Sequence, residues 1–267
     1  MALTLQRASS QLLILVIILS IFQVTPSFSF EHKKPNHKHW KHAVATYYGP
    51  KNGCGSEGGA CGYKSAVKEA PFYSLVSAGS PLLYQQGKGC GSCYEVKCTQ
   101  DPACSGDPVR VVITDECAGC GSDSKYHFDL SGTSFASLAA VGQKQKLFKS
   151  GKISIVFRKV KCQYPKRTIA FEVDSGSNHY YFATLVKFVN GDGDIEKLEM
   201  KTDSGWHSMQ RSWGALWKLD KGIQLKPPFS FKLTTKAGKT ISAKNVIPAG
   251  WNAGKTYQSS VNFHHPK

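Results

Sequence analysis

The sequence predicts an all-β protein, in which a barrel-like domain held by disulfides is followed by a β-sandwich domain. Three observations support this prediction. All nine cysteines lie before residue 163 of the 267-residue chain. Short runs rich in Val, Ile, Tyr and Phe, broken by Gly, Pro and Asn, recur along both halves of the chain. The chain is also longer than a usual single domain, which favours two domains.

Residues 1–29 have the features of a secretory signal peptide. Arg7 precedes an apolar run from Leu12 to Phe22, and Ser27-Phe28-Ser29 places small residues where a signal peptidase cleaves. The apolar run has about eleven residues, whereas roughly twenty are needed to cross a bilayer. The sequence therefore predicts a secreted, extracellular protein without a transmembrane segment.

Residues 30–42 are predicted to form a mobile arm. The segment EHKKPNHKHWKH is polar, lacks apolar periodicity and contains four of the nine histidines. Because nothing fixes these side chains in place, a solvated tail is favoured over a metal site.

The first folded domain is expected over residues 43–162. Alternating or continuous apolar runs predict strands at residues 94–98, 109–114 and 152–157. A helix is predicted at residues 134–141, where Phe135, Leu138 and Ala139 share one face. Ser131 or Thr133 is the expected N-cap of this helix.

The second domain is expected over residues 163–267, after a junction at Tyr164-Pro165-Lys166. Every strong signal in this part of the chain is that of a strand. The predicted strands span residues 169–173, 181–189, 195–200, 229–233 and 240–246. Short, regularly spaced strands with one apolar face predict a β-sandwich.

The formal net charge of +16 falls to +15 without residues 1–29, which contain one Arg and no acid. An excess of this size predicts an anionic partner, such as a pectin-bearing cell wall or a membrane surface, although it also serves general solubility. The basic residues are scattered singly rather than clustered, and the chain is predicted to be exported. Both features argue against a nucleic-acid partner.

The cysteines predict disulfides rather than zinc ligands. Cys90-Gly-Ser-Cys93 and Cys117-Ala-Gly-Cys120 have a spacing that also occurs in zinc sites. In a secreted domain, however, such a set favours disulfide bonds. Nine is an odd number, so at least one thiol is free or pairs between chains. No metal or other cofactor is expected.

An ordered set of motifs covers essentially the whole mature chain, and each motif alone is weak. In order they are ATYYG at 45–49, GGACGY at 58–63, GCGSCY at 89–94, TDEC at 114–117, HFDLSGT at 127–133 and SWGALW at 212–217. The set resembles the plant expansins, and HFDLSGT resembles the β-expansin branch in particular.

The resemblance implies a six-stranded double-psi β-barrel related to family 45 glycoside hydrolases, followed by an immunoglobulin-like β-sandwich that binds polysaccharide. It further implies that Cys61 pairs with Cys90, Cys93 with Cys162, and Cys98 with Cys104. Cys54, Cys117 and Cys120 fall outside the matched pattern. A Cys117–Cys120 bridge or a Cys54–Cys117 bridge would each leave one thiol free.

The resemblance also implies a groove that binds a glucan or xylan chain, lined by Thr46, Tyr48, Glu57, Asp115, His127 and Asp129. Asp129 takes the position of the acid in the related hydrolases, whose base is an Asp just after the N-terminal aromatic motif. Residues 48–56 hold no Asp or Glu, so that base is missing. An inverting glycosidase needs both groups, about 6.5–9.5 Å apart.

Two other carboxylates compete for the role of the base. Asp115 ends an apolar strand and is expected near Asp129, but two close acids can instead share a proton. Glu57 stands where the expansin pattern usually has Asp, so its carboxylate is displaced by about one bond length. Neither residue replaces the base convincingly, and hydrolysis is therefore not expected.

The resemblance places an aromatic platform at Tyr181 and Trp213, continued on the first domain by Tyr47, where the pattern usually has Trp. Flat exposed rings stack on the apolar faces of sugars. We expect Trp217 to lie in the core. For Tyr180, Trp206 and Trp251 the sequence leaves ligand contact open.

The leading hypothesis is a monomeric, non-enzymatic protein that binds cellulose and matrix glycans such as xylan or pectin and loosens the plant cell wall. One alternative is a weak endo-glucanase or xylanase that uses Asp129 as its acid. Another is a pure carbohydrate-binding defence protein with a barwin-like barrel.

Overall fold

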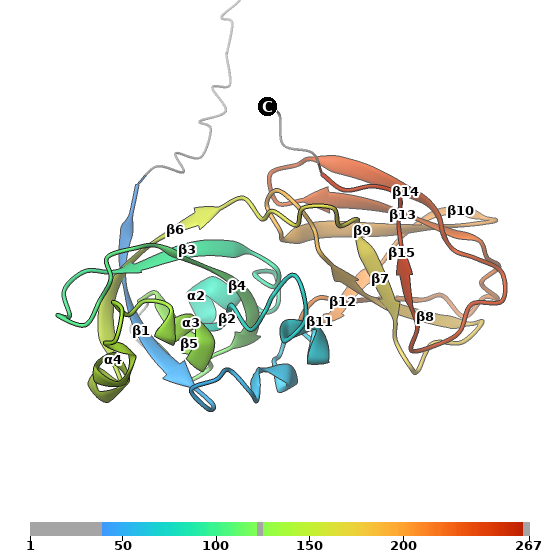
Figure 1. Ribbon diagram of the computed structural model, residues 1–267. Helices are drawn as coiled ribbons and strands as arrows, with labels where there is room; N and C mark the ends of the chain where they lie inside the picture. The colour runs from blue at the N-terminus through green and yellow to red at the C-terminus, as the bar shows by residue number, and fades with distance from the viewer. Residues whose placement is uncertain (1–38, 122–124, 264–267) are drawn as a thin grey trace, which may run out of the picture. The chain divides into compact units, whose positions relative to one another are not determined.

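The computed structural model describes residues 39–121 and 125–263, which belong to one compact unit (Figure 1). The predicted signal peptide and residues 30–38 of the predicted arm lie outside the described residues. Within these ranges, no helix is both long and apolar enough to cross a membrane. Strand β1 begins at Lys41, so the prediction of an arm that reaches His42 is wrong at its end. The strand starts this early because Lys41 and His42 pair with Phe157 and Val156.

Six strands close into a barrel in the order β1-β5-β2-β4-β3-β6. The strands are β1 (Lys41–Tyr48), β2 (Val76–Gly79), β3 (Cys93–Cys98), β4 (Val109–Glu116), β5 (His127–Ser131) and β6 (Ile153–Val160). The pairs β1–β5 and β2–β4 are parallel, and the other four are antiparallel. Closure leaves the barrel without an exposed strand edge.

The barrel forms because its strands turn alternate apolar residues inward. Ile153, Ile155 and Phe157 of β6 are buried, and the residues between them are more exposed. The Phe157 ring packs against Phe128 of β5, with ring centroids 5.0 Å apart. The three strands predicted in this half of the chain are confirmed as β3, β4 and β6.

The helix predicted at residues 134–141 is wrong in its bounds. The observed helix, α3, spans Gly132–Ala136, and the side chain of Ser131 accepts a hydrogen bond from the Ser134 amide as the N-cap. The helix ends early because the following residues bond to a distant segment. Ser105 N donates to the Leu138 carbonyl at 2.9 Å, and Ala140 N donates to the Ala103 carbonyl at 2.8 Å.

The described residues also contain four short helices that were not predicted. They are the 3₁₀ turns η1 (Ser56–Gly58) and η2 (Lys64–Val67) and the helices α2 (Pro81–Tyr84) and α4 (Lys144–Ser150). In α4 only Leu147 and Phe148 are buried. A single pair of adjacent apolar residues does not produce the repeat of three to four residues that predicts a helix from the sequence.

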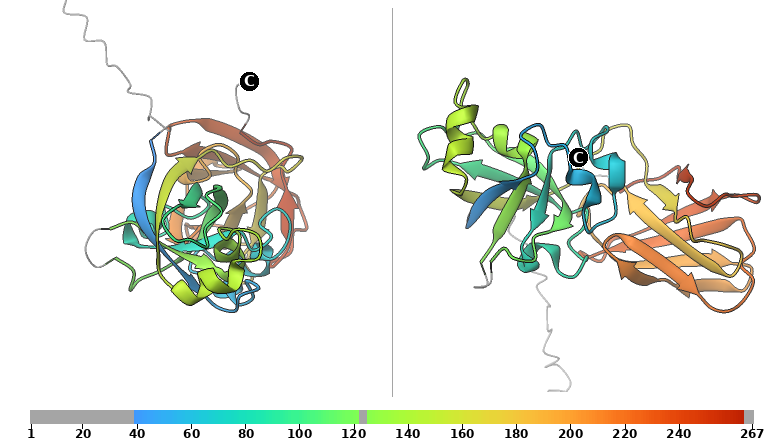
Figure 2. Two further views of the ribbon diagram at one scale, coloured as in Figure 1. Left: turned by 60° about the vertical axis from the view of Figure 1, so that its left-hand side comes forward. Right: turned by 90° about the horizontal axis from the view of Figure 1, so that it is seen from below.

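The remaining strands form two sheets that pack face to face (Figure 2). One sheet has the order β10-β9-β13-β14 and the other has the order β11-β12-β8-β7-β15. The strands are β7 (Ala170–Val173), β8 (Tyr181–Lys187), β9 (Ile195–Thr202), β10 (Gly205–Ser208), β11 (Gln210–Trp213), β12 (Leu216–Asp220), β13 (Phe229–Thr235), β14 (Thr240–Ile247) and β15 (Thr256–Gln258).

The core of the sandwich is rich in phenylalanine. Phe171 stacks on Phe231 at a centroid distance of 4.3 Å, and Phe182 meets Phe229 edge-on at 5.2 Å. The five predicted strands correspond to β7, β8, β9, β13 and β14. The predicted β-sandwich is thus confirmed.

Disulfides join Cys61 to Cys90, Cys93 to Cys162, Cys98 to Cys104 and Cys117 to Cys120. The first three are the pairs that the resemblance implies. Cys54 is free and exposed. Of the two bridges that the sequence left open, the structure has Cys117–Cys120.

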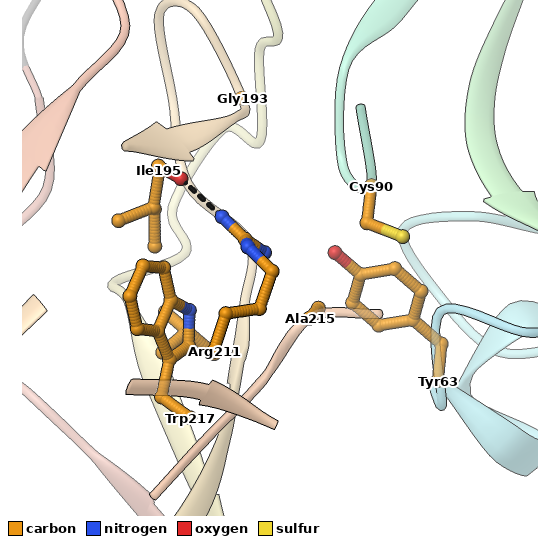
Figure 3. Close-up of a pocket in the computed structure, with 8 residues that line it drawn as sticks. Tyr63, Cys90, Gly193, Ile195, Arg211, Ala215 and Trp217 are labelled. Carbon is orange, nitrogen blue, oxygen red and sulfur yellow. Dashed lines mark hydrogen bonds between the residues drawn. The ribbon is translucent and has the colours of Figure 1, made fainter. Parts of the chain in front are cut away.

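Arg211 of β11 joins the sandwich to the barrel. Its guanidinium donates hydrogen bonds to the carbonyls of Gly87 (3.2 Å), Gly214 (2.7 Å) and Ile195 (2.5 Å). It also lies over the Trp217 ring, 4.3 Å from the centroid, in a pocket that Tyr63 lines from the barrel side (Figure 3).

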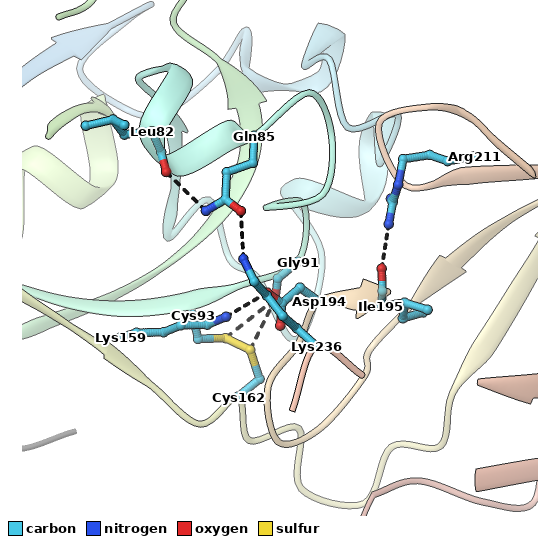
Figure 4. Close-up of polar contacts among 10 residues, drawn as sticks. All are labelled: Leu82, Gln85, Gly91, Cys93, Lys159, Cys162, Asp194, Ile195, Arg211 and Lys236. Carbon is cyan, nitrogen blue, oxygen red and sulfur yellow. Dashed lines mark hydrogen bonds and ion pairs between the residues drawn. A yellow bond between two sulfur atoms is a disulfide. The ribbon is translucent and has the colours of Figure 1, made fainter. Parts of the chain in front are cut away.

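Two further polar contacts support the same junction (Figure 4). Lys159 of β6 forms an ion pair of 2.7 Å with the buried Asp194, and Lys236 donates to the Gln85 side chain at 2.8 Å. The barrel and the sandwich are therefore connected by several independent hydrogen bonds.

Candidate functional site

One row of residues crosses four neighbouring strands of the barrel. Thr46 of β1 is the register partner of Asp129 in β5, and Ala78 of β2 is the register partner of both Asp129 and Asp115 of β4. We call these four residues the acid row. Register partners point to the same side of a sheet, and neighbouring strands lie about 4.8 Å apart. The two acids therefore lie on one side of the barrel wall, with their Cα atoms about 10 Å apart.

Thr46 connects Asp129 to His127. Its hydroxyl donates to Asp129 Oδ1 at 2.5 Å and lies 2.9 Å from His127 Nε2. A hydroxyl group can donate only one hydrogen bond. When Asp129 is ionised, the Thr46 hydroxyl donates that bond to the Asp129 carboxylate and accepts a hydrogen bond from His127. When Asp129 is protonated, both hydrogen bonds can reverse: Asp129 donates to the Thr46 hydroxyl, and the hydroxyl donates to His127. Thr46 can therefore satisfy Asp129 in both protonation states.

Burial shifts the titration of both ends of this chain. It raises the pKa of Asp129, against the opposing effects of the Thr46 hydrogen bond and of His127. Burial also lowers the pKa of His127, so the imidazole favours its neutral form. Asp129 thus holds its proton to a higher pH than an exposed Asp, as a proton donor requires.

Asp115 is held by two backbone amides. Its Oδ1 accepts hydrogen bonds from Ala60 N and Glu116 N, each at 2.7 Å. The Ala60 bond ties the end of β4 to the loop at residues 58–63. Asp115 consequently has a structural contact in addition to its place in the acid row.

Tyr48 of β1 presents an unused hydroxyl beside the two acids. Burial raises the pKa of Tyr48 to about 12; the nearby Ser56 hydroxyl opposes this shift, and the negative charges of Asp115 and Asp129 add to it. Neighbouring Ser56 donates to the Gly53 carbonyl at 2.9 Å, and within the described residues the Tyr48 hydroxyl has no partner. An unpartnered buried hydroxyl is costly unless a ligand or water completes it.

Glu57 has its charged partner outside this set. It forms an ion pair with Lys68, and its Oε2 is buried without a partner in the described part of the chain. No hydrogen bond among the described residues joins it to the acid row or to His127 or Tyr48. The structure therefore joins five of the six predicted groove residues through contacts or close charges, whereas the ion pair of Glu57 is with Lys68.

The aromatic residues Tyr181 and Trp213 lie on the same face of the five-stranded sheet. Trp213 is the register partner of Leu216, which pairs with Leu185, four residues along β8 from Tyr181. Their side chains face away from the sandwich core, as do Leu185 and Leu216. Strand geometry places their Cα atoms about 16 Å apart. Trp213 is 49% exposed and Tyr181 is partly exposed.

The loop at residues 58–63, which Asp115 holds through Ala60, also contacts Trp213. A Cβ on Gly62 would come within 2.8 Å of Trp213 Cη2, so the indole packs directly against that glycine. Ala215 N donates to the Cys61 carbonyl at 3.1 Å. The acid row and the Trp213 ring are therefore linked through the segment from Ala60 to Gly62.

The third predicted platform residue, Tyr47, is less available. Its ring packs against Phe135 and Phe148, with centroid distances of 5.0 and 4.8 Å, and is only partly exposed. The side chain of Trp217 is buried, as predicted. Tyr180 and Trp206 are exposed, at 57% and 41%.

Comparisons with known proteins identify the family. The model of the expansin C-terminal domain matches residues 169–248, and a model described as lytic transglycolase (DPBB_1) matches residues 76–157. An expansin-B11 of Oryza sativa subsp. japonica is 51% identical over 229 residues, which cover 84% of this chain and 78% of that protein. The chain belongs to the expansin family.

A longer alignment gives the same result. An expansin-B3 of Arabidopsis thaliana is 42% identical over 252 residues, which cover 93% of this chain and 95% of the relative. The solved structure of a mutant Clavibacter michiganensis expansin, in complex with cellohexaose, superposes with a TM-score of 0.65. It is 22% identical and covers 86% of this chain and all of the expansin chain, so it supports the shared fold.

Two features near the site were missed at the sequence level. Ala78 gives no chemical signal, because its role comes from its position between two acids on neighbouring strands. The sulfur atoms of Cys117 and Cys120 and a carboxylate oxygen of Asp129 all lie within 4.8 Å of one another. The CxxC spacing was visible, but its proximity to Asp129 depends on how β4 and β5 are arranged around β2.

Proposed function

We propose that this expansin binds cellulose and matrix glycans along the acid row and the Tyr181–Trp213 face, and that it loosens the plant cell wall without hydrolysis. Hydroxyl-rich chains suit the donors and acceptors of the row, and the exposed indole suits the apolar face of a sugar. The cellohexaose complex of the Clavibacter michiganensis expansin supports a β-linked glucan as one ligand.

The position of both acids on one side of the barrel disfavours hydrolysis. An inverting glycosidase places its base across the sugar ring from its acid, where it activates water. Asp129 and Asp115 project from the same wall, separated only by Ala78. A chain bound against this wall would have both carboxylates on one side, which provides hydrogen bonds but no opposed base.

One observation favours weak hydrolysis as the second candidate. Asp129 has a raised pKa, and Asp115 is fixed nearby by two amides. If a glycan passed between the two carboxylates, Asp129 could serve as the acid and Asp115 as the base. Residues 48–56 supply no Asp or Glu for this second role.

The proposed site of action is the plant cell wall. The signal-like residues 1–29 favour export, and the formal charge of +15 that remains without them favours association with a matrix that contains anionic glycans such as pectin.

Binding and cleavage can be measured in one incubation with insoluble cellulose or arabinoxylan. We expect depletion of the protein from solution, with no reducing ends above the level given by Asp129→Asn. Reducing ends released by the wild type, and lost in both Asp129→Asn and Asp115→Asn, would favour the hydrolase instead. Failure to bind either polymer would contradict the proposed function itself.

A further inference from the structure

The Cys117–Cys120 disulfide lies against the acid row. Its two sulfur atoms and a carboxylate oxygen of Asp129 are mutually within 4.8 Å. Cys117 directly follows β4, and its amide donates to the Gly79 carbonyl at the end of β2 at 2.9 Å. Opening this disulfide would therefore alter the structure next to Asp129, at the ends of β2 and β4, which contribute Ala78 and Asp115 to the acid row.

The disulfide is also the most accessible of the four. Both of its cysteines are partly exposed. In the other three bonds at least one partner is buried, with Cys61, Cys93, Cys98 and Cys162 each at most 1% exposed. Thiol–disulfide exchange requires that a thiolate reach one sulfur of the bond, so exposure favours reaction at Cys117–Cys120.

Opening this bond would leave the rest of the barrel stapled. Its cysteines are 3 residues apart, whereas Cys61–Cys90 and Cys93–Cys162 span 29 and 69 residues. In the chain-entropy account, a short loop contributes less to folding stability than a long one. The bond can therefore open while the long-range disulfides hold the fold.

We propose that Cys117–Cys120 is a redox-sensitive site, at which a dithiol reductant opens the bond and weakens glycan binding at the acid row. This inference rests on the proposed function, because the bound glycan is its readout.

A thiolate of the reductant attacks one sulfur, the Cys117–Cys120 bond breaks, and a mixed disulfide forms. The second thiol of the reductant then displaces the protein sulfur. The protein gains two electrons and two protons as two thiols, and the reductant leaves as a disulfide.

Reduction changes the wall beside Asp129. The two sulfur atoms move from a bond length of about 2 Å to a non-bonded separation of about 3.5–4 Å. The turn that they closed is released, and water gains access to the side of the Asp129 carboxylate that lies within 4.8 Å of the two sulfur atoms. Asp129 is then less well positioned for a sugar hydroxyl, and loss of one such hydrogen bond weakens affinity by about fivefold.

The test uses a Cys54→Ser background, which removes the free exposed thiol. The protein is treated with increasing dithiothreitol, the free thiols are trapped with iodoacetamide, and the labelled peptides are identified by mass spectrometry. Affinity for cellohexaose and xylohexaose is measured on the same samples. The titration of the Asp129 carboxyl is followed by NMR in the oxidised and reduced forms.

We expect Cys117 and Cys120 to be labelled before any other cysteine, and the dissociation constant to rise about fivefold or more. Reoxidation should restore the affinity, and Cys117→Ser/Cys120→Ser should match the reduced form. The Asp129 midpoint should move to lower pH, because water replaces the disulfide beside it. The groups that face Asp129 from β1, β5 and β4 are Thr46, Tyr48, His127 and Asp115, and reduction modifies none of them chemically.

The proposal is overturned if the pair opens only together with the buried disulfides, or if the reduced protein keeps both its affinity and its Asp129 midpoint. If the oxidised protein binds neither oligosaccharide, the proposed function fails. In that case, the order in which the cysteines are labelled and the pH midpoint of the Asp129 titration still test whether Cys117–Cys120 is a redox-sensitive site.

Discussion

At the scale of single residues, the hydrogen bond from Thr46 to Asp129 opposes the effect of burial on the carboxyl. Burial favours the protonated acid, whereas a donor to the carboxylate favours the ionised form. The pH at which Asp129 loses its proton therefore depends on one hydroxyl group.

Replacing Thr46 by Val should raise the pKa of Asp129 further, because the stabilising donor is lost while the burial remains. If wall loosening requires protonated Asp129, activity should persist to higher pH than in the wild type. A pH series of wall-extension rates measures this shift. Thr46→Ser keeps the hydroxyl and should retain the wild-type profile, and Asp129→Asn should show no acid-favoured rise. A wild-type profile in both Thr46→Val and Asp129→Asn would remove this carboxyl from the explanation.

Asp129→Asn should also change stability in a pH-dependent way. Because burial raises the pKa of Asp129 in the folded state, the protonated group is favourable to folding below the unfolded pKa of about 3.9. This contribution is lost as pH rises through the folded-state pKa. Thermal unfolding at pH 7 should therefore show a higher Tm for Asp129→Asn than for the wild type, and the difference should shrink near pH 3. A Tm difference that is constant with pH would contradict this account.

At the scale of elements, β10 and β11 provide a matched pair of exposed tryptophans. Trp213 of β11 is 49% exposed, and Trp206 of β10, in the other sheet, is 41% exposed. Trp213 packs against Gly62 in the loop that Asp115 holds through Ala60.

Trp213→Ala should weaken adsorption to insoluble cellulose by about tenfold, an order-of-magnitude expectation for losing one aromatic platform residue. Trp206→Ala, with a ring of the same type and similar exposure, should adsorb within about twofold of the wild type. Adsorption isotherms for the two variants provide the comparison. Equal losses would show that adsorption does not distinguish the two sheets.

The strands illustrate what the sequence could predict. Ile153, Ile155 and Phe157 alternate along one segment, so their strand can be recognised locally. The end of α3 could not be recognised, because it depends on bonds from residues 138–140 to residues 103–105. Apolar periodicity reports on neighbours within a segment and carries no information on such distant pairing.

The candidate site shows the same division. The motif resemblance indicated Asp129, Asp115 and Thr46 as members of one groove. Their order across β1, β5, β2 and β4 depends on two parallel pairings and on a bulge between Ser77 and Ala78. None of these is encoded by spacing along the chain, so neither the position of Ala78 nor that of the Cys117–Cys120 bond could be read from the sequence.

At the scale of the whole molecule, Arg211 of the sandwich connects the two halves through the Gly87 carbonyl of the barrel. Its guanidinium also donates to the carbonyls of Gly214 and Ile195 within the sandwich and lies over the Trp217 ring. Arg211→Met should lower the free energy of unfolding by about 3 kcal/mol, because buried carbonyls lose charged donors. Calorimetry should resolve separate transitions for the barrel and the sandwich where the wild type shows one. Arg211→Lys keeps the charge and should recover part of the loss. A single transition with wild-type stability in Arg211→Met would show that the other junction contacts suffice.

The central claim is that the acid row binds glycan chains and separates them without cutting them. The most direct measurement is the extension of heat-killed plant wall strips under constant load with purified protein, with reducing sugars assayed in the same bath. We predict extension that is lost with Trp213→Ala and is accompanied by no new reducing ends. Reducing ends that increase in step with extension, and disappear in Asp115→Asn, would contradict the claim and assign Asp115 as the base of a glycosidase.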